Sequence, residues 1–359
     1  MRIAIVQGTR PEIIKNYSIV KALRASGASF EVFHTNQHFS PRMCRSIYAD
    51  MEYAPDRTLP EDYRLGAAID WLQKSFAKDR IDHVLVNGDT AASLAGALAA
   101  MYMDIEVSHV EAGLRSGDTV MREERNRIMV DSVAQKLFAY TSYEKDALRN
   151  MDGIRGDVFL EGNTTLDVLH DFAGLIDRPM ATGPYVYTTL HRKELTDSRE
   201  KMANVFTALS RVAREICPVL FPVHPRTRDA LRRHGFGEDI LQDMRVTEPV
   251  STFESLSLQQ HAAAVLTDSG CVQEEAYLLG VPCITVRENT ERHLTVQHGA
   301  NVLTGFVPAR ILGAVHWALS MTDRNWPMIY GCVGAGERIV SRILADESKE
   351  SPVVYRATA

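Results

Sequence analysis

Two carboxylates of this chain follow short apolar runs at the point where each run ends. Asp89 comes soon after residues 83–86, and Glu111 comes directly after residues 105–110. Runs of this length without a polar face are typical of parallel strands covered on both sides, and such sheets bind ligands at the carboxyl ends of their strands. The sequence therefore predicts two carboxylates at one edge of a sheet, where we expect the chemistry of the protein.

A further acidic pair comes next in the chain. Glu123 and Glu124 stand at the start of a predicted helix, and three arginines flank them. These are Arg122, Arg125 and Arg127. Since acids and cations alternate here, this helix can face the same edge of the sheet and contribute both kinds of charge to a ligand.

Positive charge also follows the first predicted strand, residues 2–6. The stretch GTRPEIIK (8–15) contains a glycine turn and then a helix with Pro11 near its first position, so free N–H groups there could bind an anion. Arg10 and Lys15 add charge to that place. The stretch is neither GxGxxG nor GxxxxGK[ST], and simple solvation of Arg10 is an equally good interpretation.

Other polar groups follow later predicted strands. His38 comes after 30–35 and alone is typical of a capping or surface histidine, while His191 and Arg192 follow 185–190 and His224 follows 219–223. In TDSGCVQEEA (267–276), Ser269 and Gly270 form a predicted N-cap turn that could bind phosphate, and Glu275 could accept hydrogen bonds from ribose hydroxyls. The alternative is an ordinary capped helix whose acids favour its dipole.

The elements that carry these residues alternate between strand and helix. The alternation stops at a linker rich in proline and glycine (176–184) and then restarts, with strands predicted at 185–190, 219–223, 264–267 and 282–286. We therefore predict an α/β protein with two doubly wound, Rossmann-like domains that face a cleft. The predicted domains are 1–175 and 176–334, and the final segment, 335–359, contains a helix that could return to brace the first domain.

Composition excludes several classes of function. The net charge is −6 and no long basic block occurs, which argues against a general nucleic-acid surface. The five cysteines have no CxxC or metal-ligand spacing, so we expect no metal and a reducing cytoplasm. No segment approaches the roughly 20 apolar residues that span a bilayer, and the apolar start runs straight into a glycine turn, unlike a signal peptide.

Several stretches together resemble one family, the non-hydrolysing UDP-N-acetylglucosamine 2-epimerases, which share the two-domain GT-B architecture of certain glycosyltransferases. They occur in one order along nearly the whole chain: GTRPEIIK (8–15), NQH (36–38), NGDT (87–90), HVEAGLRSGD (109–118), EERNR (123–127), GNTTLD (162–167), HRKE (191–194), PVHPRT (222–227), TDSGCVQEEA (267–276), GVPCITVRENTER (280–292) and GANVLTG (299–305).

The resemblance implies reversible inversion at C2 of UDP-N-acetylglucosamine, through elimination and re-addition of UDP, without a metal or nicotinamide cofactor. It assigns catalysis to Asp89, Glu111, Glu123 and His191. It also implies a homodimer and a UDP-sugar as the only small-molecule partner. The substrate-binding residues that we expect from the motifs and the resemblance together are Arg10, Lys15, His38, Arg127, Arg192, His224, Ser269, Gly270, Glu275 and Arg292.

The chain departs from the family pattern around the expected ligand. Arg122 replaces a proline beside Glu123, Cys271 replaces the glycine after DSG, Ser255 aligns with an aromatic residue, and His293 replaces a proline after Arg292. The loop 59–64 also differs from the one through which bacterial members bind an activating second substrate.

Five functions remain open after these comparisons of motifs. The first two are an epimerase of UDP-N-acetylglucosamine and an epimerase of a modified UDP-2-acetamido sugar. The others are a hydrolysing relative, against which the Arg10-Pro11-Glu12 sequence speaks, and a glycosyltransferase or a binding protein without catalysis, in which the carboxylates would be unexplained.

Overall fold

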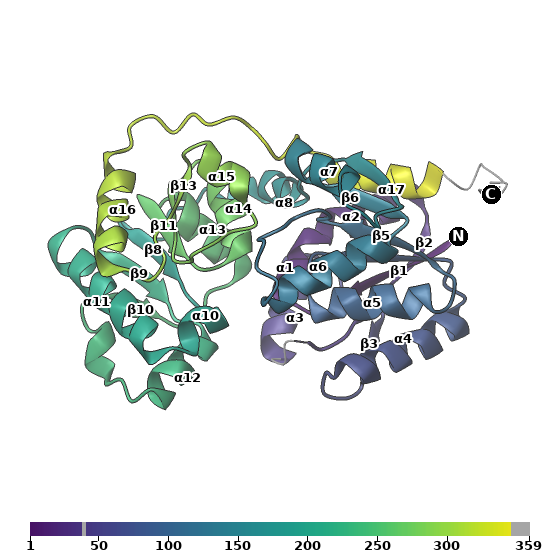
Figure 1. Cartoon of the computed structure of the whole chain (residues 1–359), viewed down its shortest axis with the longest axis horizontal. Coiled ribbons are helices and arrows are strands. Elements are labelled where there is room, and N and C mark those ends of the chain that lie inside the picture. The colour runs from purple at the N-terminus through teal and green to yellow at the C-terminus, as the bar shows by residue number, and fades with distance from the viewer. Residues whose placement is uncertain (38–40, 346–359) are drawn as a thin grey trace.

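A computed structural model describes residues 1–37 and 41–345 of the chain, leaving out the side chains of 41–45 and 238. It contains two parallel sheets with helices between their strands (Figure 1). The first sheet has the order β3-β2-β1-β4-β5-β6-β7, and the second has the order β10-β9-β8-β11-β12-β13. Both sheets are doubly wound, which confirms the predicted fold class.

The N-terminal unit comprises the elements from β1 to α9. Its strands are β1 (Arg2–Gln7), β2 (Ser29–His34), β3 (Arg57–Thr58), β4 (His83–Asn87), β5 (Glu106–Val110), β6 (Lys136–Ala139) and β7 (Asp157–Leu160). Its helices are α1 (Arg10–Lys15), α2 (Tyr17–Ser26), α3 (Pro41–Asp50), α4 (Leu65–Asp79), α5 (Ala91–Met101), α6 (Arg122–Val133), α7 (Ser142–Arg149), α8 (Thr165–Asp171) and α9 (Ala173–Ile176).

The C-terminal unit comprises the elements from β8 to α16. Its strands are β8 (Val186–Thr189), β9 (Val219–Pro222), β10 (Arg245–Thr247), β11 (Ala264–Thr267), β12 (Cys283–Thr285) and β13 (Asn301–Leu303). Its helices are α10 (Lys193–Thr196), α11 (Arg199–Glu215), α12 (Pro225–Arg233), η1 (Glu238–Leu241), α13 (Thr252–Gln260), α14 (Gly270–Leu278), α15 (His293–Gln297) and α16 (Pro308–Ser320).

Strands that are apolar along their whole length explain why helices cover both faces of the sheets. In β1, Ile3 and Ile5 join an apolar cluster with α2, whereas Ala4 and Val6 join another with α4, α5 and α6. Since successive side chains of a strand point to opposite faces, a run that is apolar throughout requires helices on both sides. None of the helices in the described part of the chain is long and apolar enough to cross a membrane.

Three short strands were not predicted. The segment 54–63 is rich in proline and acidic residues, which is typical of a loop, but its residues 57–58 pair with β2 as β3, and the Asp56 carboxylate accepts the Val32 N–H at 2.8 Å. Strand β10 has only exposed residues, and β13 is only partly buried. Edge strands of this kind carry no apolar run, so only their pairing partners specify them.

The last described helix, α17 (Ala335–Ala345), lies beside the N-terminal unit, at the end of a segment that crosses over from α16 (Figure 1). Ile339, Val340 and Ile343 are buried in the cluster that contains β1 and α2. The Asp167 carboxylate accepts N–H groups of Gly334 at 2.6 Å and Gly336 at 2.9 Å, which caps the helix. We therefore propose the domain bounds 1–175 and 176–334, with the helix of the final segment, 335–359, attached to the first domain.

Close packing of α17 leads to a stability prediction. A Cβ atom on Gly336 would lie 2.5 Å from the carbonyl carbon of Ser18 in α2. We expect Gly336→Ala to lower the free energy of unfolding by about 1–3 kcal/mol, because the backbones of two helices would have to separate. Gly313 is the matched control, since a Cβ there would meet nothing within 4 Å in the exposed face of α16.

Urea unfolding of both variants checks this expectation. Gly313→Ala should be more stable than the parent protein by about 0.5–1 kcal/mol, because alanine favours the helix. Equal stability of the two variants would show that α17 does not pack against α2 as described.

Candidate active site

The strand order of each sheet reverses between two neighbouring strands, β1 and β4 in the first sheet and β8 and β11 in the second. In such sheets, ligands bind outside the carboxyl ends of the strands at these reversals. Lys15 ends the helix after β1, and Asp89 and Glu111 follow β4 and β5. Ion pairs connect Lys15, Glu111 and the Asp89 partner Arg127 to groups of the C-terminal unit. The two reversals therefore face each other across one site.

We call the ionic groups of this site the inter-sheet charge cluster. The Lys15 Nζ atom lies 3.1 Å from Glu274, the Arg292 guanidinium lies 2.7 Å from Glu111, and Arg127 lies 3.6 Å from Glu291. Each of these pairs joins the two units. The members of the cluster are Lys15, Asp89, Glu111, Arg127, Arg192, Glu274, Arg287, Glu291 and Arg292.

Glu111 lies at the centre of this cluster, with a side chain only 6% exposed. Lys15 contacts one carboxylate oxygen, Arg292 donates to the other at 2.7 Å, and the Tyr140 hydroxyl lies 3.4 Å from the first. The φ angle of Glu111 is +71°, in the left-handed region that residues with a Cβ atom rarely adopt. Strain of this kind is concentrated at functional sites, so the carboxylate is held in place at an energetic cost.

Asp89 and Glu123 differ from Glu111 in their surroundings. Asp89 follows β4, is 21% exposed and forms an ion pair with the buried Arg127 of α6. Glu123, in the first turn of α6, is half-buried and has no hydrogen-bond or ion-pair partner among the described residues. Of the three predicted carboxylates, Glu123 is therefore the one whose oxygens are open to a ligand.

The two buried cations Lys15 and Arg292 are charged. Burial opposes the charge and lowers the pKa of Lys15, but neighbouring negative groups, Glu111 and Glu274 among them, raise it well above its ordinary value. Burial likewise acts against the charge of Arg292, and Glu274, Glu291 and Glu111 raise its pKa. Both residues are therefore fixed positive charges beside Glu111.

The acidic partners from the C-terminal unit are ionised for the same reason. Burial raises the pKa of Glu291, but Arg287, Arg292 and other arginines hold it well below its usual range. Burial also raises the pKa of Glu274, and Arg292 and Lys15 more than reverse the effect. The sequence did not identify either carboxylate as a site residue, because both occur in stretches where acids at a helix or turn are common on the surface.

His191 and His224 lie together after β8 and β9. Their ring centroids are 5.0 Å apart, and the rings are tilted by 32°. The Asp268 carboxylate accepts the backbone N–H groups of His191 and Arg192, each at 2.8 Å, so Asp268 fixes the loop after β8 against β11. Asp268 is a supporting residue that sequence reasoning did not single out.

Among the described residues, no side chain caps the first turn of helix α14. Helix α14 begins at Gly270, as predicted, but the N-cap Ser269 forms no side-chain hydrogen bond with the first turn. A Cβ atom on Gly270 would lie 2.5 Å from the Glu291 carboxylate, which explains the need for glycine. Burial raises the pKa of Glu275 above its ordinary value. A hydrogen bond from Gln259 and the charge of Arg10 lower the pKa but do not reverse this effect.

The N-terminus of α1 differs from the prediction. We expected free N–H groups there, but the Glu12 carboxylate accepts the N–H groups of Gly8 at 2.9 Å and Thr9 at 2.8 Å. The expectation of an open anion site at this helix is therefore wrong, because a capping box fills it. Arg10 has no hydrogen-bond or ion-pair partner among the described residues and remains available to a ligand.

The predicted residues thus divide into three groups. Lys15, Asp89, Glu111, Arg127, Arg192 and Arg292 belong to the inter-sheet charge cluster. Arg10, Glu123, His191, His224, Ser269 and Gly270 follow strand ends or stand at the starts of helices, and Glu275 lies within α14. His38 lies outside the described residues. In the part of the chain that the structure describes, no group of three or more histidine, cysteine, aspartate or glutamate side chains is arranged to hold a metal ion.

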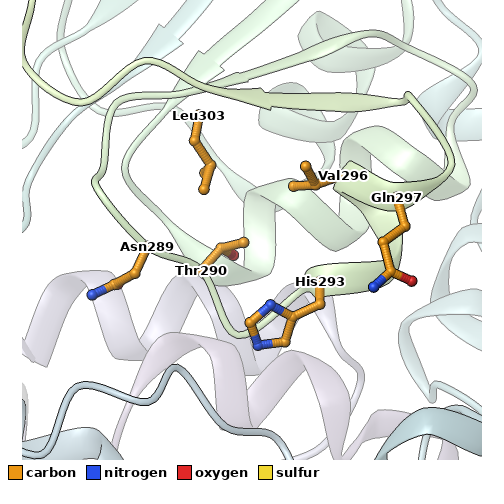
Figure 2. Close-up of a pocket in the computed structure, with 6 residues that line it drawn as sticks. All are labelled: Asn289, Thr290, His293, Val296, Gln297 and Leu303. Carbon is orange, nitrogen blue, oxygen red and sulfur yellow. The ribbon is translucent and has the colours of Figure 1, made fainter.

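A cavity of about 240 Å³ lies beside the charge cluster in the C-terminal unit (Figure 2). Its lining includes His293, one of the positions where the chain departs from the family pattern. The Nε2 atom of His293 lies 2.7 Å from the carbonyl oxygen of Arg115, so this histidine also joins the two units. The residues that line the cavity are Asn289, Thr290, His293, Val296, Gln297 and Leu303.

Comparison with known proteins gives a consistent result. A family model described as UDP-N-acetylglucosamine 2-epimerase matches residues 21–344. The UDP-N-acetylglucosamine 2-epimerase of Methanocaldococcus jannaschii is 36% identical, over 96% of this chain and 99% of that protein. Its crystal structure in complex with UDP-GlcNAc and UDP has a TM-score of 0.90 at 36% identity, covering 96% of this chain and 99% of that one.

Two further relatives mark the range of similarity. The UDP-2,3-diacetamido-2,3-dideoxy-D-glucuronate 2-epimerase of Pseudomonas aeruginosa is 34% identical, over 94% of this chain and 98% of that protein. The spinosyn rhamnosyltransferase SpnG is only 12% identical, with a TM-score of 0.54 over 97% of this chain and 95% of that one. The latter shares the two-unit fold, as expected for the GT-B architecture, and nothing more follows from it.

Proposed function

Since this chain belongs to the UDP-N-acetylglucosamine 2-epimerase family, we propose that it interconverts UDP-N-acetylglucosamine and UDP-N-acetylmannosamine by inversion at C2. The observation that carries the proposal is the position of Glu111, a strained and buried carboxylate at the meeting point of the two sheets, between Lys15 and Arg292. A site with several carboxylates and several fixed cations suits both proton transfer and an anionic leaving group.

We propose that the reaction runs by elimination and re-addition. The C2 proton of the sugar is not acidic, so its removal has to accompany cleavage of the C1–O bond to UDP, which leaves a 2-acetamidoglucal. Re-addition of UDP at C1 in its original configuration, with a proton delivered to the opposite face of C2, then gives the epimer. A carboxylate is needed to take the proton from C2 and one is needed to return it, and Asp89, Glu111 and Glu123 are the candidates.

The cations have a separate role in this proposal. The diphosphate gains negative charge as the C1–O bond breaks, and fixed positive charges nearby stabilise that charge without reorganising. Arg10, Arg192 and Arg292 are suitable by position, and His191 could protonate the leaving oxygen. The open first turn of α14 could bind a phosphate with its N–H groups, and Glu275 could accept hydrogen bonds from the ribose.

An incubation with UDP-N-acetylglucosamine in deuterated water, followed by proton NMR, tests the function. We expect UDP-N-acetylmannosamine to appear with deuterium at C2, because the proton exchanges with solvent while the alkene is bound. Appearance of UDP with free N-acetylmannosamine would contradict the proposal and assign the chain to the hydrolysing type. Retention of the C2 proton in the epimer would contradict the proton-transfer mechanism.

A second candidate is an epimerase of a modified UDP-2-acetamido sugar. It is favoured by the 34% identity to the diacetamido-glucuronate epimerase, nearly as high as that to the N-acetylglucosamine enzyme. Arg122, which is exposed beside Glu123 and has no partner among the described residues, could contact a sugar carboxylate. The same NMR assay with both UDP-sugars distinguishes the candidates, since the true substrate should give the higher kcat/KM.

We also propose that the protein is a homodimer, as the resemblance implied, and that it works in the cytoplasm. Light scattering in solution tests the first point, and a monomer at micromolar concentration would contradict it. Four cysteines are free within the described residues, which agrees with a reducing compartment.

A further inference from the structure

His109 is a fully buried histidine on β5 that the proposed reaction does not use. Its Nδ1 atom lies 2.6 Å from the Asp131 carboxylate of α6, and its Nε2 atom lies 2.9 Å from the carbonyl oxygen of Gly88. Both partners can act only as acceptors if Asp131 is ionised. Each ring nitrogen therefore has an acceptor within hydrogen-bond distance.

The donors around Asp131 favour its ionised form. Burial raises its pKa, but His109 and Arg115 more than offset the effect and leave the pKa below its ordinary value. Its second oxygen accepts a hydrogen bond from the Arg115 guanidinium at 2.6 Å and from the Gly113 N–H at 3.2 Å. The carboxylate therefore has no proton to donate to His109.

A neutral imidazole would satisfy only one of the two acceptors. With a proton on one nitrogen, the lone pair of the other would point at a carbonyl or carboxylate oxygen in a site without solvent, which is costly. We propose that His109 is a buried imidazolium at neutral pH, and that its N–H donation to the Gly88 carbonyl positions the catalytic candidate Asp89.

The geometry of the Gly88–Asp89 turn supports this role. Gly88 has φ +76°, and its N–H donates to the Val110 carbonyl at 2.9 Å. The Asn126 amide of α6 donates to the Asp89 carbonyl at 2.8 Å. Together with the bond from His109 to the Gly88 carbonyl, these contacts hold the turn against both β5 and α6. The Asp89 side chain then contacts Arg127.

The other two candidate carboxylates stand on or next to the elements that carry this pair. Glu111 follows His109 on β5 by two residues, and Glu123 lies in the first turn of the helix that carries Asp131. The charged groups around the pair are Asp131 and Arg115 in contact, with Asp89 and Glu111 at the neighbouring strand ends. Helix α5, which also packs on β5, has no charged residue.

NMR of the nitrogen-15-labelled protein tests the protonation state directly, without reference to activity. We expect both ring nitrogens of His109 to carry protons at about pH 8, well above the ordinary range of histidine. A single protonated ring nitrogen at that pH would overturn the proposal. In Asp131→Asn we expect one ring proton to be lost between about pH 6 and about pH 8, because the compensating charge is gone.

Kinetics test the positioning role, which rests on the proposed epimerase function. We expect His109→Gln to lower kcat roughly 10²-fold with KM nearly unchanged, since a displaced Asp89 affects the reaction more than binding. In Asp131→Asn, kcat should fall with rising pH as the ring proton is lost, unlike in the parent protein. Unchanged kcat in His109→Gln would overturn the positioning role even if NMR shows the imidazolium.

His83 provides the matched control. It is also fully buried, on the neighbouring strand β4, and its Nε2 atom lies 2.8 Å from the Ser108 hydroxyl, far from the carboxyl ends of the strands. We expect His83→Gln to affect stability alone, with kcat and its pH profile unchanged. A comparable loss of kcat in His83→Gln would show that any buried histidine of this sheet has the same effect, and would overturn the assignment.

Discussion

Replacement of Glu111 by glutamine is expected to lower kcat by roughly 10³-fold, because the amide keeps the shape of the side chain but cannot accept a proton. The structure holds this carboxylate in a left-handed backbone conformation, with Lys15 and Arg292 on its two oxygens. Steady-state assays with UDP-N-acetylglucosamine measure the effect. KM should change much less than kcat if the carboxylate acts mainly in the transition state.

Two further variants test whether the loss of kcat comes from the Glu111 carboxylate itself. Glu111→Asp keeps the carboxylate but shortens its reach, so kcat should lie between those of the parent and of Glu111→Gln. Glu106→Gln is the control, since Glu106 is at the opposite end of the same strand, where it pairs with Lys136 at 3.1 Å. Parent-like activity of Glu111→Gln would contradict a catalytic role for this residue.

Replacement of Glu274 by glutamine is expected to have the largest effect on stability. Its carboxylate is buried and lies 2.5 Å from Arg292 and 3.1 Å from Lys15. Removing one partner from a buried ionic network leaves the other charges without compensation, which costs about 3–5 kcal/mol. We expect a value near the lower end, about 3 kcal/mol, because Glu111 still contacts both cations.

Urea unfolding measures this loss, and two variants test the explanation. Glu215→Gln removes one partner of an exposed pair with Arg211 at 3.2 Å, and its unfolding midpoint should equal that of the parent. Adding Lys15→Met to Glu274→Gln should recover part of the lost stability, because the uncompensated cation is gone. A double variant less stable than Glu274→Gln would contradict this account.

A pH dependence follows from the same network. Because Lys15 and Arg292 hold the pKa of Glu274 below its unfolded value, its contribution to stability is present above that unfolded value and is lost as the pH falls through the folded pKa. The parent should therefore lose stability in acid more steeply than Glu274→Gln. Parallel curves would show that Glu274 does not contribute in this way.

Much of the fold could be predicted because it depends on local pattern. The apolar runs at 83–86 and 105–110 became β4 and β5 within one residue at each end, and the N-cap turn before α14 starts where predicted. A strand buried on both faces has to be apolar throughout, so its sequence identifies it. The same rule placed Asp89 and Glu111 at the ends of neighbouring strands, which pair in parallel.

Other features depend on contacts between distant segments. The sequence shows Glu12 as one acid in GTRPEIIK, but only the folded turn lets its carboxylate fill the N-terminus of α1. Strand β10 has no apolar run, so pairing with β9 alone makes it a strand. Glu274 and Glu291 look like surface acids until the N-terminal unit buries them against Lys15 and Arg127.

The sequence by itself thus determined the types of the candidate residues and their places after strands, since both follow from local pattern and from the motifs. The tertiary structure alone decided which charges compensate one another, because pairs such as Glu111 and Arg292 are joined only when the two units meet. It also decided the surroundings of His109, which lies between Asp131 and the Gly88 carbonyl, both remote in sequence. Local pattern specifies elements, whereas burial and charge depend on everything packed around a group.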